Sequence, residues 1–181
     1  TGLALNFNAC SKQSPLQADL EKVEPQNQFR ILPLGFTNNS LQKVTTVSKW
    51  ITVQNGGFLT LQHTGNGISV NSALYILPGT ISQDAEVSLS LDDEQFIGSL
   101  DLVFEPHGIT FSQPALLTIV ASGLDLSGYD PTKLDIYYYD EDTGAWEKMQ
   151  RDAFIAEPYT GSVIVQNARL PHFSRYAIAA E

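Results

Sequence analysis

The chain has 181 residues, of which 43% are hydrophobic and 17% charged, and its formal net charge at pH 7 is −10. This composition is ordinary for one globular domain and argues against intrinsic disorder, which needs few apolar residues and a high charge density. It also argues against nucleic acid as a partner, because phosphates are bound by clusters of Lys and Arg. No Lys or Arg stands between Lys49 and Lys133, a stretch rich in Asp and Glu. That acidic stretch indicates a solubilising surface, or else a Ca²⁺ site or a contact for a basic partner.

Residues 1–28 resemble an export and tethering segment. Residues 1–10 are apolar and rich in small side chains, as in the trailing half of a signal peptide. Phe7-Asn8-Ala9-Cys10 resembles a bacterial lipobox, in which Cys10 would carry the lipid, although most lipoboxes have Leu at the position of Phe7. The polar stretch over residues 11–28 would then be a tether. The alternative for Cys10, the single cysteine, is a plain thiol without a disulfide partner in the chain.

No apolar run approaches the length of about 18 residues that a membrane-spanning helix needs. Any contact with a membrane is therefore expected to run through the lipid on Cys10. The sequence predicts no bound cofactor.

From residue 29 onward the pattern is one of short β segments broken by Gly and Pro. Residues 85–91 alternate between apolar and polar side chains with a period of two, which is typical of a strand with one buried face. Residues 134–139 and 145–149 flank the turn Asp140-Glu141-Asp142-Thr143-Gly144 and predict a hairpin. Further strands are expected at residues 58–61, 68–70, 73–77, 100–104, 115–120, 162–165 and 176–178. We therefore predict one all-β domain over residues 29–181, an antiparallel β-sandwich or a barrel.

Three blocks of sequence resemble the ZU5 domain. The first joins Gly56-Gly57-Phe58-Leu59-Thr60-Leu61 to Leu77-Pro78-Gly79-Thr80-Ile81, and the second, over residues 104–115, resembles the central strand connection of the family. The third, over residues 170–178, is similar to its closing strand. The resemblance implies a ZU5-like β-sandwich that mediates contacts with a protein partner, most like the exported bacterial versions that stand alone.

His172-Phe173-Ser174 is the motif with a legible mechanism. In some scaffolds that contain ZU5 domains, this triplet marks self-cleavage between Phe and Ser, which would make Ser174 the nucleophile and His172 the base. A strained backbone and donors for the developing oxyanion would also be needed. The alternative is a closing strand, in which Phe173 and Ala177 lie on one face and Ser174, Tyr176 and Ile178 lie on the other.

Other groups of residues carry weaker predictions. His63, His107 and His172 lack the spacing of metal ligands, and the 140–144 segment lacks the order of a Ca²⁺ loop, so no metal site is expected. A hydrolase or a Ca²⁺-dependent binder would require convergent carboxylates, such as Asp125, Asp130 and Asp140.

Tyr137, Tyr139 and Trp146 could form an aromatic platform for a carbohydrate or a peptide, although alternation buries either Tyr138 or the pair Tyr137 and Tyr139. The leading hypothesis is an exported interaction or display module in a bacterial cell envelope, anchored by a lipid or secreted, with no conventional catalytic activity. Self-processing at Phe173-Ser174 and Ca²⁺-dependent or carbohydrate binding are the alternatives.

Overall fold

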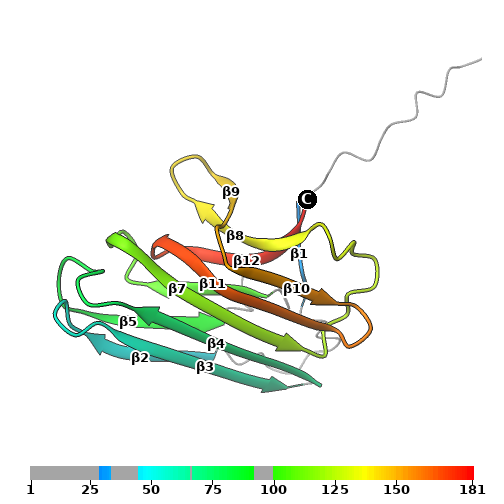
Figure 1. The fold of residues 1–181 in the computed structure, drawn as a ribbon, viewed down its shortest axis with the longest axis horizontal. Helices are drawn as coiled ribbons and strands as arrows, with labels where there is room; N and C mark the ends of the chain where they lie inside the picture. Colours follow the sequence, from blue (N-terminus) through cyan, green and yellow to red (C-terminus); the bar gives the residue numbers. More distant parts are fainter. Residues whose placement is uncertain (1–28, 34–44, 66, 92–99) are drawn as a thin grey trace, which may run out of the picture.

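The structure, a computed structural model, describes residues 29–33, 45–65, 67–91 and 100–181. All regular structure in these residues is β, and it forms two antiparallel sheets that pack face to face (Figure 1). The predicted all-β antiparallel sandwich is thus confirmed. Within these ranges no helix is long and apolar enough to span a membrane. The predicted export leader and tether, including Cys10, lie outside the described residues.

The larger sheet has seven strands in the order β2-β5-β6-β12-β8-β9, and β1 pairs with the end of β12. The smaller sheet has five strands in the order β10-β11-β7-β4-β3. The strands of the seven-stranded sheet are β1 (Arg30–Ile31), β2 (Thr45–Ile51), β5 (Ala85–Leu91), β6 (Asp101–Glu105), β8 (Leu134–Asp140), β9 (Ala145–Lys148) and β12 (Arg175–Ala180). Those of the five-stranded sheet are β3 (Gly57–Gly65), β4 (Ile68–Ile76), β7 (Thr110–Ser122), β10 (Ala153–Glu157) and β11 (Ser162–His172).

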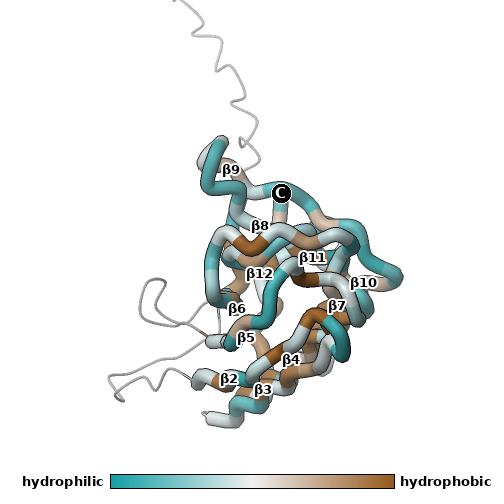
Figure 2. Tube along the Cα trace, turned by 90° about the vertical axis from the view of Figure 1, so that its left-hand side faces the viewer, coloured by the Kyte–Doolittle hydropathy of each residue, from teal (hydrophilic) through white to brown (hydrophobic). Residues whose placement is uncertain are grey.

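The core lies between the two sheets and is formed by the alternate side chains of each strand. On β5 the buried residues are Ala85, Val87, Leu89 and Leu91, as the period-two pattern predicts. The facing layer includes Leu74 and Ile76 of β4. Figure 2 shows hydrophilic residues gathered on the β8–β9 hairpin and the loops, while the strands carry the hydrophobic residues. Burial of apolar surface on two facing sheets is the main source of stability for such a fold.

β2 passes from the larger sheet into a tight turn and continues as β3 in the smaller one. Gly56 closes this turn with φ +60°, and a Cβ atom there would lie 2.2 Å from the carbonyl oxygen of Ile76, so only glycine fits. Side chains of β2 then join the two strands: Lys49 donates to the carbonyl oxygen of Phe58 at 3.3 Å, and Thr45 Oγ1 lies 3.0 Å from His63 Nδ1. β2 therefore accompanies the edge of β3 along one side of the sandwich.

Candidate functional site

The His172-Phe173-Ser174 triplet lies where the chain crosses between the sheets. β11 ends at His172 in the five-stranded sheet and β12 begins at Arg175 in the seven-stranded sheet. The pairing of β11 with β7 also shifts register between Leu170 and His172. The prediction of one extended strand through the triplet is therefore wrong, because Phe173 and Ser174 form the corner between two strands.

Phe173 anchors this corner in the core. Its ring is buried and lies edge-on to Phe111 at 4.8 Å and parallel to Phe104 at 6.1 Å between ring centroids. Such aromatic contacts add to the free energy of burial. Phe173 points between the sheets, as do Tyr176 and Ile178, because the break at the corner resets the alternation that would have placed it on the opposite face.

Ser174 is also buried, and its hydroxyl donates to the carbonyl oxygen of Tyr139 at 2.7 Å. Its own carbonyl oxygen accepts a hydrogen bond from the backbone N–H of Phe104 at 3.2 Å. These two bonds tie the corner to the end of β8 on one side and to β6 on the other. The contacts of Ser174 are thus those of a buried polar residue whose hydrogen bonds are satisfied by backbone.

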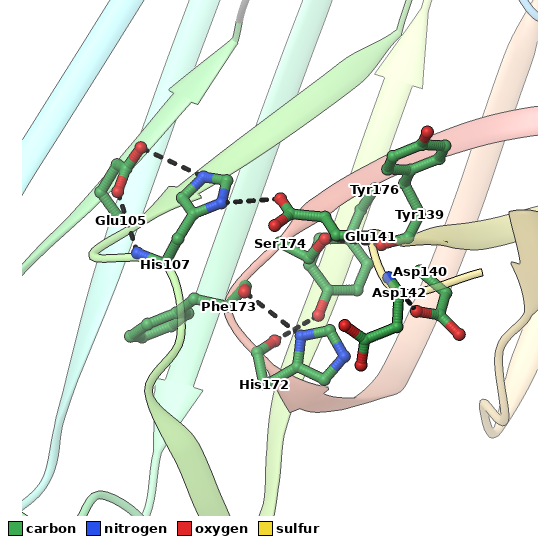
Figure 3. Close-up of polar contacts among 10 residues, drawn as sticks. All are labelled: Glu105, His107, Tyr139, Asp140, Glu141, Asp142, His172, Phe173, Ser174 and Tyr176. Carbon is green, nitrogen blue, oxygen red and sulfur yellow. Dashed lines mark hydrogen bonds and ion pairs between the residues drawn. The ribbon is translucent and has the colours of Figure 1, made fainter. Parts of the chain in front are cut away.

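His172 contacts the peptide bond that self-cleavage would break. Its Nδ1 lies 3.2 Å from the carbonyl oxygen of Phe173 (Figure 3). Its ring is edge-on to that of Tyr138, with 5.5 Å between the ring centroids. The Tyr176 hydroxyl donates to the carbonyl oxygen of His172. In this arrangement a protonated Nδ1 could polarise the Phe173 carbonyl, whereas the Ser174 proton points to Tyr139. The geometry therefore gives His172 a place beside the carbonyl oxygen instead of the general-base position beside the hydroxyl.

A pocket of about 190 Å³ opens at this corner, lined by residues 108, 110, 140–142 and 172–174. His107 stands beside it, with Nε2 3.1 Å from Glu105 and Nδ1 3.0 Å from Glu141, as Figure 3 shows. The imidazole thus joins the loop after β6 to the turn after β8. All three of these side chains are substantially exposed, and such contacts contribute little to stability.

The carboxylates of Asp125, Asp130 and Asp140 do not converge. Asp125 and Asp130 lie in the loop before β8 and Asp140 ends that strand, roughly 20 Å further along. Each carboxylate caps its own turn instead: Asp125 accepts from the N–H of Ser127, and Asp130 from Thr132.

Hydrogen bonds from Thr143 and from the N–H of Asp142 hold the pKa of Asp140 below its usual range. Among the described residues, no group of three or more His, Cys, Asp or Glu side chains is placed to hold a metal ion. The arrangement required for the hydrolase or Ca²⁺-dependent hypothesis is therefore missing from these three positions.

The aromatic group lies on the outer face of the seven-stranded sheet but is not an open platform. Tyr137 is buried, and Phe29 lies edge-on to it at 5.0 Å while stacking on Trp146 at 5.3 Å. Tyr139 packs against Trp146 at 5.4 Å, and the guanidinium of Arg175 lies over the same indole at 5.7 Å. The prediction of a binding platform is wrong for Tyr137, because Phe29 covers the ring that a ligand would have to reach.

Buried ion pairs complete this outer face. Asp135, only 1% exposed, lies 2.5 Å from Arg151 and 2.7 Å from Lys148. Asp101, equally buried, pairs with Arg175. Carboxylates can remain charged at such depth only when they are paired, so these cations are structural partners.

The outer face of the five-stranded sheet, which sequence reasoning missed, is of the opposite kind. In cross-strand register, Phe58 lies beside Tyr75 and Tyr75 beside Leu116, while Val120 lies beside Ile164 and Ile164 beside Ile155. Next to the first row, and in register with one another, are Thr60, Ala73 and Thr118. We call these nine residues the neutral face. On β4 and β3 the row of Val120 is continued by the polar residues Asn71 and Gln62.

The exposed fractions on the neutral face are high: 55% for Phe58, 50% for Tyr75, 42% for Val120 and 43% for Ile155. β3, β4 and β7 contain no Asp, Glu, Lys or Arg at all. That absence, in a chain with 20 acidic residues, was the signal in the sequence that could have found this surface.

Comparison of this chain with protein-family models, with curated proteins and with solved structures finds no match.

Proposed function

We propose that this chain is a non-catalytic interaction module that makes contact through the neutral face. It is exported and displayed at a bacterial cell envelope, where a lipid on Cys10 holds it to the membrane. The observation that carries the proposal is an uncharged sheet face with large apolar side chains left in solvent.

The composition of the neutral face supports a contact surface. Scattered apolar residues are normal on any protein, but Phe58 and Tyr75 are neighbours, and so are Ile155 and Ile164. Contiguous apolar surface rimmed by polar residues marks a site of interaction. Protein interfaces also have centres that are depleted of charge and enriched in aromatic residues, with a polar rim. The neutral face has both properties.

The rim of this face carries charge of both signs. Lys49 lies over the ring of Phe58 at 4.5 Å, and Arg169, next to Leu116 in register, pairs with Asp152 at 2.7 Å. Glu157 is exposed at the end of β10. A partner would therefore meet an apolar centre inside a border of two basic and two acidic side chains.

The resemblance to ZU5 domains is compatible with this proposal, since that family implies a β-sandwich that binds proteins. Two glycines in the resembling blocks, Gly56 and Gly79, have positive φ angles and form turns of the sandwich. Fold alone does not define function, so the proposal depends on the neutral face and not on the resemblance.

Hydroxyl-radical footprinting tests the proposal. The labelling of Tyr75 is compared with that of Trp50, which is 63% exposed on the outer face of the other sheet, in intact cells and in dilute purified protein. We expect Tyr75 to be protected in cells while Trp50 is labelled equally in both samples. An unchanged ratio of Tyr75 to Trp50 labelling would show that nothing covers the neutral face.

Self-processing at Phe173-Ser174 is the second candidate, favoured by the single contact of His172 Nδ1 with the Phe173 carbonyl oxygen. Ser174 Oγ would attack the carbonyl carbon, the amide nitrogen would leave as the new amino terminus, and water would hydrolyse the resulting ester. The intact mass of the denatured chain decides this question. A fragment ending at Phe173 that is absent from Ser174→Ala would establish the cleavage.

A further inference from the structure

The strands β3 and β4 lie side by side at one edge of the five-stranded sheet (Figure 1). We propose that their outer surface binds an uncharged polysaccharide, whose sugar rings pack on Phe58 and Tyr75 and whose hydroxyl groups bond to Gln62 and Asn71. This site includes part of the neutral face, so it rests on that face being a contact surface. The ligand is identified from the order of the side chains along the two strands and from their lack of charge.

The outward side chains of β3 and β4 change in kind from one end of the strands to the other. In cross-strand register they form four pairs, which are Phe58 with Tyr75, Thr60 with Ala73, Gln62 with Asn71, and Thr64 with Ser69. We call these eight residues the β3–β4 strip. All are exposed except Ala73 and Ser69, which are half-buried. The strip is thus aromatic at one end and rich in carboxamide and hydroxyl groups over the rest of its length, which is roughly 20 Å in all.

The aromatic end of the strip offers a surface for a sugar ring. A pyranose has ring faces of C–H groups, which pack on aromatic rings, and a rim of hydroxyl groups, which need hydrogen bonds. Tyr75 is 50% exposed and Phe58 is 55% exposed, although Lys49 Nζ lies 4.5 Å from the centroid of the Phe58 ring. The lysine therefore helps to fix the Phe58 ring and leaves about half of the side chain to a ligand.

The pair of carboxamides, Gln62 and Asn71, supplies the polar contacts. Each carboxamide both donates and accepts hydrogen bonds, as each sugar hydroxyl does. Asn71 Nδ2 donates to Ser69 Oγ at 3.3 Å, which steadies this side chain on the surface. Gln62 follows Phe58 by four positions on β3, roughly 13 Å, so one extended chain of sugars can reach both ends of the strip.

The same carboxamides oppose an apolar partner. A purely apolar surface laid over the strip would remove water from Gln62 and Asn71 without replacing their hydrogen bonds, which costs free energy. A ligand that covers the aromatic pair and also bonds to the amides avoids this cost. Sugars combine an apolar ring face with hydroxyl groups in every unit of the chain.

Charge restricts the ligand further, to an uncharged one. The chain carries a formal net charge of −10, so an anionic polysaccharide would be repelled. A cationic ligand would find no carboxylate on the strip, since β3 and β4 contain no Asp or Glu. An uncharged polysaccharide meets neither penalty, and a few well-placed polar groups on an apolar surface are enough to orient it.

Native gel electrophoresis of the full chain, with a polysaccharide cast into the gel, tests this proposal. The uncharged probes are soluble starch, dextran, galactomannan, xyloglucan, arabinoxylan and mixed-linkage β-glucan, and alginate is the anionic control. Binding to a polysaccharide retards the acidic chain on its way to the anode, and the retardation at increasing polysaccharide concentration gives a dissociation constant. We expect retardation by at least one of the uncharged probes and free migration with alginate.

Substitutions on the strip test the two kinds of contact separately. Tyr75→Ala should raise the dissociation constant at least about tenfold, because a sugar ring loses its aromatic surface. Gln62→Ala should raise it about fivefold, because the hydroxyl groups lose one hydrogen-bonding partner. Both side chains are exposed, so the variants keep the fold.

Trp50→Ala is the matched control, because Trp50 is the more exposed aromatic side chain but lies on the outer face of the other sheet. It should be retarded as the unmodified chain is. Free migration with every uncharged probe, or equal retardation of Tyr75→Ala, Gln62→Ala and the unmodified chain, overturns the proposal. Free migration combined with protection of Tyr75 in cells would keep the interaction module and give the neutral face a protein partner, whereas free migration without that protection removes both proposals.

Discussion

The outer faces of the two sheets differ in how their charged and aromatic side chains are covered. On the seven-stranded sheet, Asp135 is buried beneath Arg151 and Lys148, and Phe29 covers the ring of Tyr137. On the five-stranded sheet, Phe58 and Tyr75 stand in solvent with no charged residue on their strands. The first face satisfies its polar and aromatic groups within the chain, and the second leaves large apolar side chains in solvent.

We propose that this difference separates stability from interaction in this molecule. Buried charges are strongly destabilising once a partner is removed, so the ion pairs of the larger sheet belong to the folded state of a single chain. Half-exposed apolar residues contribute less to that state and more to association. Substitutions on the larger sheet should therefore change the free energy of unfolding more than substitutions on the neutral face do, and this contrast can be measured.

Asp135→Ala should give the largest effect, a loss of about 3 kcal/mol in the free energy of unfolding. It leaves the part-buried Arg151 without its carboxylate, and it opens space where the aspartate lay. The loss stays at the low end for a broken buried pair, because Lys148 is half exposed and can reach water. Urea denaturation followed by circular dichroism measures this change.

Thr60→Ala on the neutral face is the counterpart, and it should change the free energy of unfolding by less than about 0.5 kcal/mol. Equal costs for Asp135→Ala and Thr60→Ala would show that the two faces do not differ in the way described.

Alkaline pH should destabilise the fold through the tyrosines of the larger sheet. Burial, with Glu181 and Asp135 nearby, raises the pKa of Tyr137 to about 12, and a hydrogen bond to Glu147 together with burial raises the pKa of Tyr138 to about 12. An unfolded tyrosine loses its proton near pH 10, so the folded state is favoured fully below about pH 10 and loses this stability between about pH 10 and 12.

The free energy of unfolding, measured across that range, should fall less steeply in Tyr137→Phe than in the unmodified chain. A flat profile in the unmodified chain up to about pH 12 contradicts this prediction.

Ser174→Ala, at the corner that joins the two sheets, should cost about 1 kcal/mol of stability. The substitution removes the 2.7 Å hydrogen bond and leaves the Tyr139 carbonyl oxygen without that donor. Thermal unfolding of the intact chain reports the loss. If Ser174→Ala is as stable as the unmodified chain, the hydroxyl does not have the structural role that its contacts indicate, and self-processing gains weight.

Local pattern predicted the strands whose environment is set by one buried face. The alternation over residues 85–91 is β5, and the turn at residues 140–144 joins β8 to β9 as a hairpin. Other predicted strands were shorter than the strands in the structure. Residues 68–70 and 73–77 were predicted as two strands but fall largely in one, β4, and residues 115–120 are only part of β7. Period two identifies a strand wherever its two faces differ in polarity.

Tertiary contacts decided what the pattern could not. β2 and β10 were not predicted, because their exposure pattern at the sheet edges does not alternate cleanly. β8 has four buried residues in succession, Leu134 to Tyr137, since its outer face is covered by side chains distant in sequence. The stacking of Phe29 on Trp146 and the crossing at Phe173 belong to this class.

The pairing of β1 with β12 has a practical consequence. Arg30 lies opposite Ala180, so the chain enters the sandwich and leaves it at neighbouring points of one sheet, roughly 5 Å apart. Residues 29–181 could therefore be inserted into a surface loop of a host protein without separating the ends of that loop. The two ends could also be joined by a short peptide, with new termini placed elsewhere in the fold. The close spacing of its two ends therefore suits both insertion into another protein and circular permutation.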